Sequence, residues 1–387
     1  MTESLRIRAV ELHELSLPLL EPFIISGGTM THRRSLVVVI RDTDGHEGWG
    51  EAPPFELPFY SEETLASARD LLERVLIPRL VGREFTGPEA VDAALRAGIR
   101  GNPFARAALE TAAWDLEADR RRVGLADLLA ERLGVRRAAT ISCGVALGIP
   151  GDRSLDTLRA SVREAVALGY RRVKIKVMPG WDVAAIRAAR EAMHGAGLPL
   201  TVDANGSYEW PAHEEVLRAI DELGLLYIEQ PLHPDELVGH AELGRALATP
   251  VCLDETLRDA RAARQVEALG GPRIWNVKVH RIGGLSEVCR IWRIAERYGA
   301  TLWAGTMPES GIGSQAALAA ASLPGFDYPS DVEASARWFG RNADVIKLVM
   351  GRQGTMAVPG QPVGRLVDRG RFARASSPIG TLQAETP

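Results

Sequence analysis

Short hydrophobic runs separated by amphipathic segments fill the chain from about residue 139 to residue 340. The segments between the runs, such as 154–168 and 183–196, have the periodicity of helices. Strands that alternate with helices in this way indicate a parallel sheet. Seven or eight such units favour a closed (β/α) barrel over an open sheet. The runs are TISCGVALG, RRVKIKV, PLTVDAN, LLYIEQPL, TPVCLDET, RIWNVKV and ATLWAGT.

The beginning of the chain has a different pattern. Residues 5–18 and 35–50 contain alternating apolar runs interrupted by the turn residues of segment 43–45, which predicts an antiparallel sheet with hairpins. Asn102 and Pro103 are typical of a helix start, and apolar residues follow at helical spacing to about residue 120.

These changes of pattern divide the chain into three parts. We expect an α+β capping domain over residues 1–135 and a barrel over residues 136–340. After residue 340 the alternation ends and Gly and Pro become frequent, so we expect residues 341–387 to pack back onto the first domain.

The strand RVKIKV, residues 172–177, carries two like charges on one face. Because side chains alternate along a strand, Lys174 and Lys176 project from the face opposite to Val173, Ile175 and Val177. Two ammonium groups side by side in a barrel strand need a chemical explanation.

One charged residue recurs near the C-terminal end of each of five consecutive predicted strands. These residues are Lys176, Asp203, Glu229, Asp254 and Lys278, at intervals of 27, 26, 25 and 24 residues. Each interval corresponds to one βα unit, so in a barrel all five side chains lie at the rim where barrel enzymes build their active sites.

Three carboxylates that converge away from water need a compensating cation. Oxygen ligands from Asp203, Glu229 and Asp254 suit Mg²⁺, with Mn²⁺ or another divalent cation possible, and the lack of His and Cys in the set disfavours zinc. Asn205, two positions after Asp203, lies on the same strand face and could help hold the site. Glu255 follows Asp254 directly, so we expect it to point the other way and to support the site from behind.

The lysines are candidate bases. Repulsion between neighbouring ammonium groups and partial burial lower the pKa of an amine, so Lys176 is predicted to act as a neutral base with Lys174 behind it. Lys278 arrives across the barrel mouth. This arrangement suits removal of a proton α to a metal-held carboxylate, since the metal stabilises the enediolate that forms.

Composition and charge exclude other classes of function. The 46 basic and 50 acidic residues give a net charge of −4, and the arginines are scattered, so no nucleic-acid surface is expected. The start of the chain does not fit a signal peptide, and no 18 uncharged apolar residues run together, so we expect a cytoplasmic protein without membrane contact. Cys143, Cys252 and Cys289 are expected to be reduced core thiols.

The motifs around the five charged residues resemble those of the enolase superfamily, in its muconate lactonising enzyme subgroup. Further stretches along nearly the whole chain are similar to its o-succinylbenzoate synthase / N-succinylamino acid racemase family. The first set comprises KIK at 174–176, DAN at 203–205, EQP at 229–231, DET at 254–256 and Lys278. The second set comprises PFIISGGT at 22–29, GWGEAP at 48–53, PFYSEET at 58–64, AALETAAWDLE at 107–117, KVHRIGG at 278–284 and MPESGIG at 307–313.

The resemblance implies a (β/α)7β barrel with an N-terminal α+β cap that the C-terminal segment completes. It also implies a small-molecule carboxylate substrate and a homo-oligomer. Arg281, three residues after Lys278, is implied to tune that lysine. Further residues near the substrate are implied to be Ser26, Thr29 and Tyr60 in the cap, and Met307, Glu309, Ser310 and Gly311 in the barrel.

Two activities remain open within this family. The first is o-succinylbenzoate synthase, an enzyme of menaquinone biosynthesis. In this reaction Lys176 removes the α-proton and then protonates the departing hydroxyl, while Lys278 supports the delocalised anion as a cation. The alternative is racemisation of N-succinyl or other N-acyl amino acids, in which Lys176 and Lys278 are paired bases, and both activities could share one site.

The stretch 305–309, GTMPE, departs from the family's usual Gly-Gly-Met-Leu-Glu. The following GIGSQA, residues 311–316, imitates a dinucleotide-binding fingerprint but lacks its context in a first βαβ unit. The helix N-terminus expected there could instead receive an anionic group of the substrate.

Overall fold

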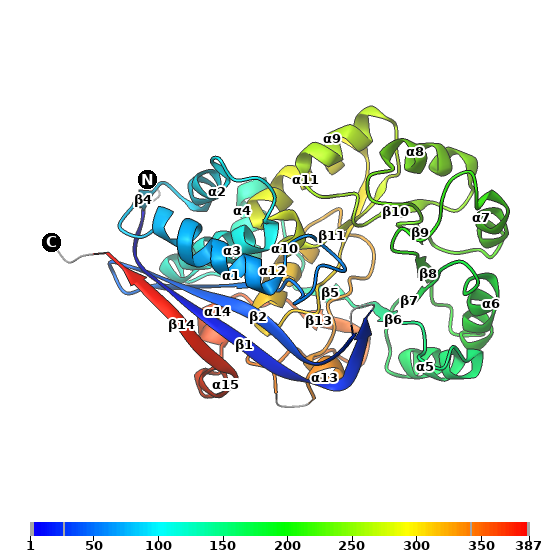
Figure 1. The fold of residues 1–387 in the computed structure, drawn as a ribbon, viewed down its shortest axis with the longest axis horizontal. Coiled ribbons are helices and arrows are strands. Elements are labelled where there is room, and N and C mark those ends of the chain that lie inside the picture. Colours follow the sequence, from blue (N-terminus) through cyan, green and yellow to red (C-terminus); the bar gives the residue numbers. More distant parts are fainter. Residues whose placement is uncertain (1–3, 26–27, 341–342, 385–387) are drawn as a thin grey trace.

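The computed structural model describes residues 4–25, 28–340 and 343–384. Figure 1 shows an antiparallel sheet with its helices on one side of the molecule and a curled parallel sheet surrounded by helices on the other. The predicted combination of a barrel with an N-terminal α+β cap is therefore confirmed.

The cap sheet is antiparallel, with the strand order β14-β1-β2-β3 and the short β4 paired to β1. The carboxylate of Asp42 shapes the hairpin between β2 and β3, because it accepts hydrogen bonds from the backbone N–H groups of Asp44 and His46 at 2.9 and 2.8 Å. The strand β14, near the C-terminus, lies along β1 at the edge of this sheet. The strands are β1 (Leu5–Ile25), β2 (Gly28–Asp42), β3 (Glu47–Ala52), β4 (Glu84–Phe85) and β14 (Ser376–Gln383).

The barrel sheet contains seven parallel strands in chain order from β6 to β12. They are β6 (Val145–Leu147), β7 (Val173–Lys176), β8 (Leu200–Asp203), β9 (Ile228–Glu229), β10 (Val251–Leu253), β11 (Ile274–Val277) and β12 (Thr301–Ala304). The helices that connect or follow them are α5 (Leu155–Ala167), α6 (Val183–Ala192), α7 (Glu214–Asp221), α8 (Leu237–Ala246), α9 (Ala260–Ala268), α10 (Val279–Ile282), α11 (Leu285–Tyr298) and α12 (Gly311–Ala321).

An irregular segment, residues 325–331, lies between the two ends of this parallel sheet. On one side the backbone N–H of Asp331 donates to the carbonyl of Ala304 at 2.9 Å. On the other side the N–H of Gly144 donates to the carbonyl of Ser330 at 2.8 Å. This segment thus takes the place of an eighth strand, and Asp331 reaches the barrel interior through it.

The remaining elements complete the cap and the base of the barrel. A two-stranded sheet joins β5 to β13. The elements are α1 (Leu65–Leu71), the π-helix η1 (Leu72–Leu76), the 3₁₀ helix η2 (Ile77–Arg79), α2 (Pro88–Arg96), α3 (Pro103–Arg121), α4 (Leu125–Leu133), β5 (Thr140–Ser142), α13 (Ser335–Trp338), β13 (Thr355–Ala357), α14 (Val363–Leu366) and α15 (Arg369–Ala375).

Helix α3 lies directly on strand β3. A Cβ atom added at Gly48 would be 2.0 Å from the carbonyl oxygen of Ala112, and one added at Gly50 would be 2.0 Å from that of Ala108. Only residues without a side chain permit so close a contact between the two backbones. The contact explains why the glycines of GWGEAP occur together with the alanines of AALETAAWDLE.

Buried acidic side chains of the cap hold the N-termini of barrel helices. Glu110 of α3 accepts hydrogen bonds from the backbone N–H groups of Leu285 and Ser286, both at 2.7 Å, where α11 begins. Glu51 of β3 accepts one from Gly313 at 2.8 Å in the first turn of α12. A carboxylate is favourable at a helix N-terminus because it meets unpaired N–H groups and the positive end of the helix dipole. The cap is therefore anchored to two consecutive barrel helices.

Most predicted elements occur where the patterns placed them, with two main differences. The run TISCGVALG divides between β5 of the two-stranded sheet and β6 of the barrel, and one helix ends early. The helix expected over 183–196 stops at Ala192, because Gly195 and Gly197 adopt left-handed conformations with φ of 79° and 64°. The boundaries at residues 135 and 340 stay predictions. Cys143, Cys252 and Cys289 are buried and form no disulfide, as expected.

Within the described ranges, no helix has both the length and the apolar character needed to cross a membrane.

Candidate active site

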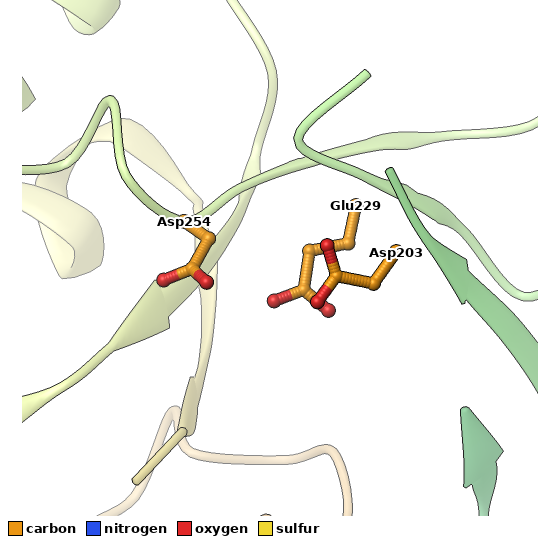
Figure 2. Close-up of side chains that lie close together, drawn as sticks. All are labelled: Asp203, Glu229 and Asp254. Carbon is orange, nitrogen blue, oxygen red and sulfur yellow. The ribbon is translucent and has the colours of Figure 1, made fainter. Parts of the chain in front are cut away.

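Three carboxylates meet at the C-terminal ends of neighbouring strands. Asp203 ends β8, Glu229 ends β9, and Asp254 directly follows β10. One oxygen atom from each lies within 4.8 Å of the other two, and Figure 2 shows the three groups close together at the strand ends. All three side chains are buried. The structure therefore brings together the three acids that the spacing singled out.

Lys174 lies beneath this cluster and is neutralised by carboxylates. Its ammonium group is 2.9 Å from Glu229 Oε2, 3.5 Å from Asp203 Oδ2 and 2.8 Å from Asp331 Oδ2. Burial alone would lower the pKa of Lys174, but the three negative charges outweigh it and raise the pKa well above its usual range. The charge of Lys174 is thus balanced by three carboxylates, which does not fit the expectation that Lys174 acts on Lys176 as an uncompensated like charge.

Lys176 lies nearer the mouth and is the most accessible of the three site lysines, with 32% of its side chain exposed. Its ammonium group donates to Asp203 Oδ2 at 2.6 Å and also to the side-chain oxygen of Asn205. The backbone N–H of Asn205 donates to the other oxygen of Asp203 at 3.0 Å. Asn205 therefore holds both the acid and the lysine.

Glu255 also lies in the site, which corrects the expectation that it points away. Its carboxylate accepts a hydrogen bond of 2.7 Å from the side-chain amide of Asn205. Strand β10 ends at Leu253, so the alternation of a strand does not extend to residue 255. Burial and the neighbouring charge of Asp254 raise the pKa of Glu255.

Lys278, which follows strand β11, lies on the side of the acidic cluster opposite to Lys176. Its ammonium group donates to Asp254 Oδ2 at 2.9 Å and to the hydroxyl of Tyr60 at 2.8 Å, and it lies 4.8 Å from the centre of the Tyr60 ring. Arg281 forms an ion pair with Asp254 and donates to the same hydroxyl at 3.2 Å. Tyr60 of the cap is thus part of the site in the barrel.

Burial and mutual repulsion make three ionised carboxylates costly. Burial, with the charge of Asp203 added to it, raises the pKa of Glu229 to about 8. Burial acts in the same direction on Asp254, but Arg281 and Lys278 outweigh it and lower the pKa below its usual range. Lys176 and Lys174 likewise outweigh burial at Asp203 and lower its pKa, so burial disfavours the charged form of Glu229 alone among the three.

The donor set fits a hard divalent cation. All three donors are carboxylates, and within the described residues this is the group of acids found close enough to share an ion. Carboxylate oxygens are the donors that hard cations such as Mg²⁺ prefer, so Asp203, Glu229 and Asp254 would be able to hold such an ion.

The second predicted set, at the end of β12, is buried and already hydrogen-bonded to protein. Met307, Glu309, Ser310 and Gly311 have little or no exposed surface. The backbone N–H of Gly311 donates to Asp344 at 2.9 Å, and that of Ser310 donates to Glu51 at 3.1 Å.

The expectation that this helix N-terminus receives an anionic group of the substrate is therefore wrong in this structure, because protein carboxylates occupy its donors. The sequence gives no local sign of this, since Glu51 and Asp344 are far from Gly311 along the chain.

The three cap residues predicted to lie near the substrate differ in what the structure shows of them. Tyr60 reaches Lys278, as described above. Thr29 belongs to β2, where its backbone lies opposite Ile24. Ser26 lies outside the described residues.

Two further side chains contact the site and were not singled out from the sequence. Asn276 donates from its side-chain amide to Glu229 Oε1 at 2.7 Å. It precedes Lys278 by two positions, so the parity argument used for Lys174 and Lys176 could have found it. Asp331 contacts Lys174. It follows Lys278 by 53 residues, about two of the intervals between strand ends, but the segment that carries it is not a regular strand.

Comparison with known proteins finds related domains, sequences and structures. The sequence model for an enolase C-terminal domain-like region matches residues 157–362, and that for the mandelate racemase / muconate lactonizing enzyme N-terminal domain matches residues 8–130. The chain is 44% identical to N-succinylamino acid racemase of Thermus thermophilus, over 92% of this chain and 93% of that protein. It is 39% identical to o-succinylbenzoate synthase of Geobacillus kaustophilus, over 96% of each chain.

A solved structure of an enolase superfamily member from Listeria innocua is also similar, with a TM-score of 0.89 and 31% identity over 98% of each chain. Fold, acidic cluster and flanking lysines together define a barrel enzyme for carboxylate chemistry. The chain belongs to the enolase superfamily and, within it, to the family of o-succinylbenzoate synthases and N-succinylamino acid racemases.

Proposed function

We propose that this chain removes the proton α to a carboxylate of a small-molecule substrate, and that it acts as an o-succinylbenzoate synthase in menaquinone biosynthesis. The observation that carries the proposal is the position of two lysines, Lys176 and Lys278, at the two ends of one buried cluster of three carboxylates. A base beside an electrophilic centre is what α-proton abstraction requires.

Asp203, Glu229 and Asp254 would hold a divalent cation, which we propose to be Mg²⁺, with Mn²⁺ as another fitting ion. When bound, the cation would supply Lewis-acid stabilisation of the negative charge that develops on the substrate carboxylate. Lys174 and Asn276 hold the two oxygens of Glu229, so this ligand is oriented before substrate arrives.

Lys176 is proposed as the base because it is the accessible lysine and has its amine at the cluster. In its neutral form it takes the α-proton and then returns a proton to the departing hydroxyl on the same face, which completes a syn loss of water from a hydroxylated cyclohexadiene carboxylate. Lys278 remains a cation that stabilises the delocalised anion. Asp254 and Tyr60 orient its ammonium group.

Racemisation of N-succinyl or other N-acyl amino acids is the second candidate. Lys278 supports it, because a second amine at the other end of the cluster can serve the opposite face of the α-carbon. The relative from Thermus thermophilus, at 44% identity, carries the racemase name, whereas the one from Geobacillus kaustophilus carries the synthase name. One site could perform both reactions.

The deciding experiment measures kcat/KM for the synthase substrate and for a panel of N-succinyl and N-acetyl amino acids on the same enzyme preparation. A clear preference for the synthase substrate supports the first proposal, and a preference for an N-acyl amino acid selects the second. The Lys176→Ala variant, purified identically, is the control for contaminating activity. Absence of turnover with every one of these substrates would overturn both.

Two properties of the whole protein complete the proposal. We propose a cytoplasmic protein without nucleic-acid partners, consistent with its balanced charge and reduced thiols. We also propose a homo-oligomer, which light scattering of the purified protein tests directly.

A further inference from the structure

A chain of buried charges lies under the acidic cluster. Lys174 contacts Glu229 on one side and Asp331 on the other, at 2.9 and 2.8 Å. The second oxygen of Asp331 forms an ion pair with Arg172, which is completely buried. Asp331 is therefore held between two cations, one of which contacts a proposed metal ligand.

The surroundings leave this lysine few alternative positions. The ring of Trp303, from β12, lies 4.7 Å from the ammonium group of Lys174 and 4.8 Å from the guanidinium of Arg172. Both cations thus lie close to the ring of one tryptophan, a contact that is favourable for buried cations. Asp331 itself is positioned by the backbone hydrogen bond between its N–H and Ala304.

We propose that Asp331 is a positioning residue for the metal ligand Glu229 and acts through Lys174. By holding the ammonium group from below, Asp331 keeps it at Glu229 Oε2, while Asn276 holds Oε1 at 2.7 Å. The inference rests on the proposed function, because it assumes that Glu229 binds a divalent cation.

Loss of the Asp331 charge has two physical consequences for a cation at the cluster. Lys174 has a long flexible side chain, and without Asp331 its ammonium group can turn toward Asp203, 3.5 Å away, and leave Glu229 less well oriented. In addition, Arg172 and Lys174 lose a shared counter-charge, so the site becomes more positive and repels a dication. Both effects weaken metal binding.

The test is Mn²⁺ binding to the full-length protein without substrate, followed by electron paramagnetic resonance of the free ion. The Asp331→Asn variant keeps the shape of the side chain and removes its charge. We expect its Kd for Mn²⁺ to rise about 10- to 100-fold, the usual effect of losing a residue that orients a ligand. A Kd within twofold of wild type, even with a lower Tm, would overturn the proposal.

Glu333→Gln is the matched control. Glu333 is also a buried carboxylate, two residues further along, but its partners are Arg337 at 2.6 Å and the backbone of Ala146. We expect its Mn²⁺ affinity to stay within about twofold of wild type. An equal loss in both variants would overturn the specific role of Asp331.

A second variant keeps the inference testable if Asp331→Asn does not fold. If Asp331→Asn is not folded by near-ultraviolet circular dichroism, Asp331→Glu replaces it, because it keeps the charge and displaces the carboxylate. We expect at least threefold weaker Mn²⁺ binding for Asp331→Glu, and an unchanged Kd contradicts the inference.

Asp203→Asn separates this inference from the proposed function. If wild type binds no Mn²⁺, or if Asp203→Asn binds it as well as wild type, the proposed metal site itself is wrong. If Asp203→Asn loses Mn²⁺ while Asp331→Asn retains it, only the role of Asp331 is wrong.

Discussion

The carboxylate of Glu51, in strand β3 of the cap, accepts a hydrogen bond of 2.5 Å from the hydroxyl of Ser310, the N-cap residue of barrel helix α12. The same carboxylate accepts the backbone N–H groups of Ser310 and Gly313 at 3.1 and 2.8 Å. Glu51 has no exposed surface. A single side chain of the cap thus accepts three hydrogen bonds from donors at the start of barrel helix α12.

Glu51→Ala should destabilise the protein substantially. It leaves three buried donors without a partner, which costs on the order of 3 kcal/mol or more in the free energy of unfolding. Urea unfolding measures this loss. Glu56→Ala is the control, because Glu56 is exposed and pairs with Arg34 at 3.4 Å, and it should change stability by no more than about 0.5 kcal/mol. Equal midpoints for the two variants would contradict the anchoring role of Glu51.

Gly50→Ala should disrupt the contact between β3 and α3. The new Cβ would meet the carbonyl oxygen of Ala108 at 2.0 Å, so one backbone must move, and we expect a loss of at least about 2 kcal/mol. Gly380→Ala is the matched control, since nothing lies within 4 Å of the corresponding position in β14. Thermal unfolding of both variants should show a lower Tm for Gly50→Ala alone.

The two lysines should have separable effects on proton exchange. Lys176→Ala should reduce turnover by about 10²- to 10⁴-fold, the usual contribution of a general base. Lys278→Ala should stop α-proton exchange of one enantiomer of an N-succinyl amino acid in D₂O, as followed by proton NMR, and leave the other enantiomer exchanging. The exposed Lys347→Ala serves as the control and should behave as wild type. Equal deuterium incorporation into both enantiomers by Lys278→Ala would refute the two-face geometry.

Removal of divalent metal should stop either reaction. After treatment with a chelator, activity should fall to background and return on addition of Mg²⁺ or Mn²⁺, because the charge that develops on the substrate carboxylate would lose its stabilisation. Asp203→Asn should show no recovery at the same metal concentration. Full turnover in a metal-free sample would exclude the proposed site.

His240 should make stability fall in acid. The pKa of this buried histidine is lowered to about 4 by burial, its Nδ1–H donates to the carbonyl of Glu236 at 2.7 Å, and its Nε2 accepts the N–H of Leu232 at 3.3 Å. The folded protein therefore favours the neutral ring. This contribution is complete above pH 6.5, the unfolded value, and is lost as the pH falls through about 4, by roughly 3 kcal/mol in total.

Urea unfolding of wild type and His240→Gln between pH 7 and pH 4 measures the contribution of His240 to the free energy of unfolding. The difference in unfolding free energy between the two proteins should shrink as the pH falls, because only wild type must protonate a buried ring. A difference that does not vary with pH would show that His240 does not cause the effect.

Much of the site was predictable because it follows from regular geometry. The intervals of 24 to 27 residues placed Lys176, Asp203, Glu229, Asp254 and Lys278 at the ends of successive strands, and each of these strands exists. Parity along β7 put Lys174 and Lys176 on one face, and both contact Asp203. Parity failed for Glu255, because the strand ends before it.

The amino-acid sequence by itself determined the order of strands and helices, the spacing of the acids and the lysines, and the family to which the motifs belong, because these depend on local periodicity and on chain distance. Only the tertiary structure decided that Glu51 occupies the helix start at Ser310, that Tyr60 contacts Lys278, and that Asp331 neutralises Lys174. Each of these pairs joins segments more than 150 residues apart in the chain, and no local pattern carries the position of such a partner.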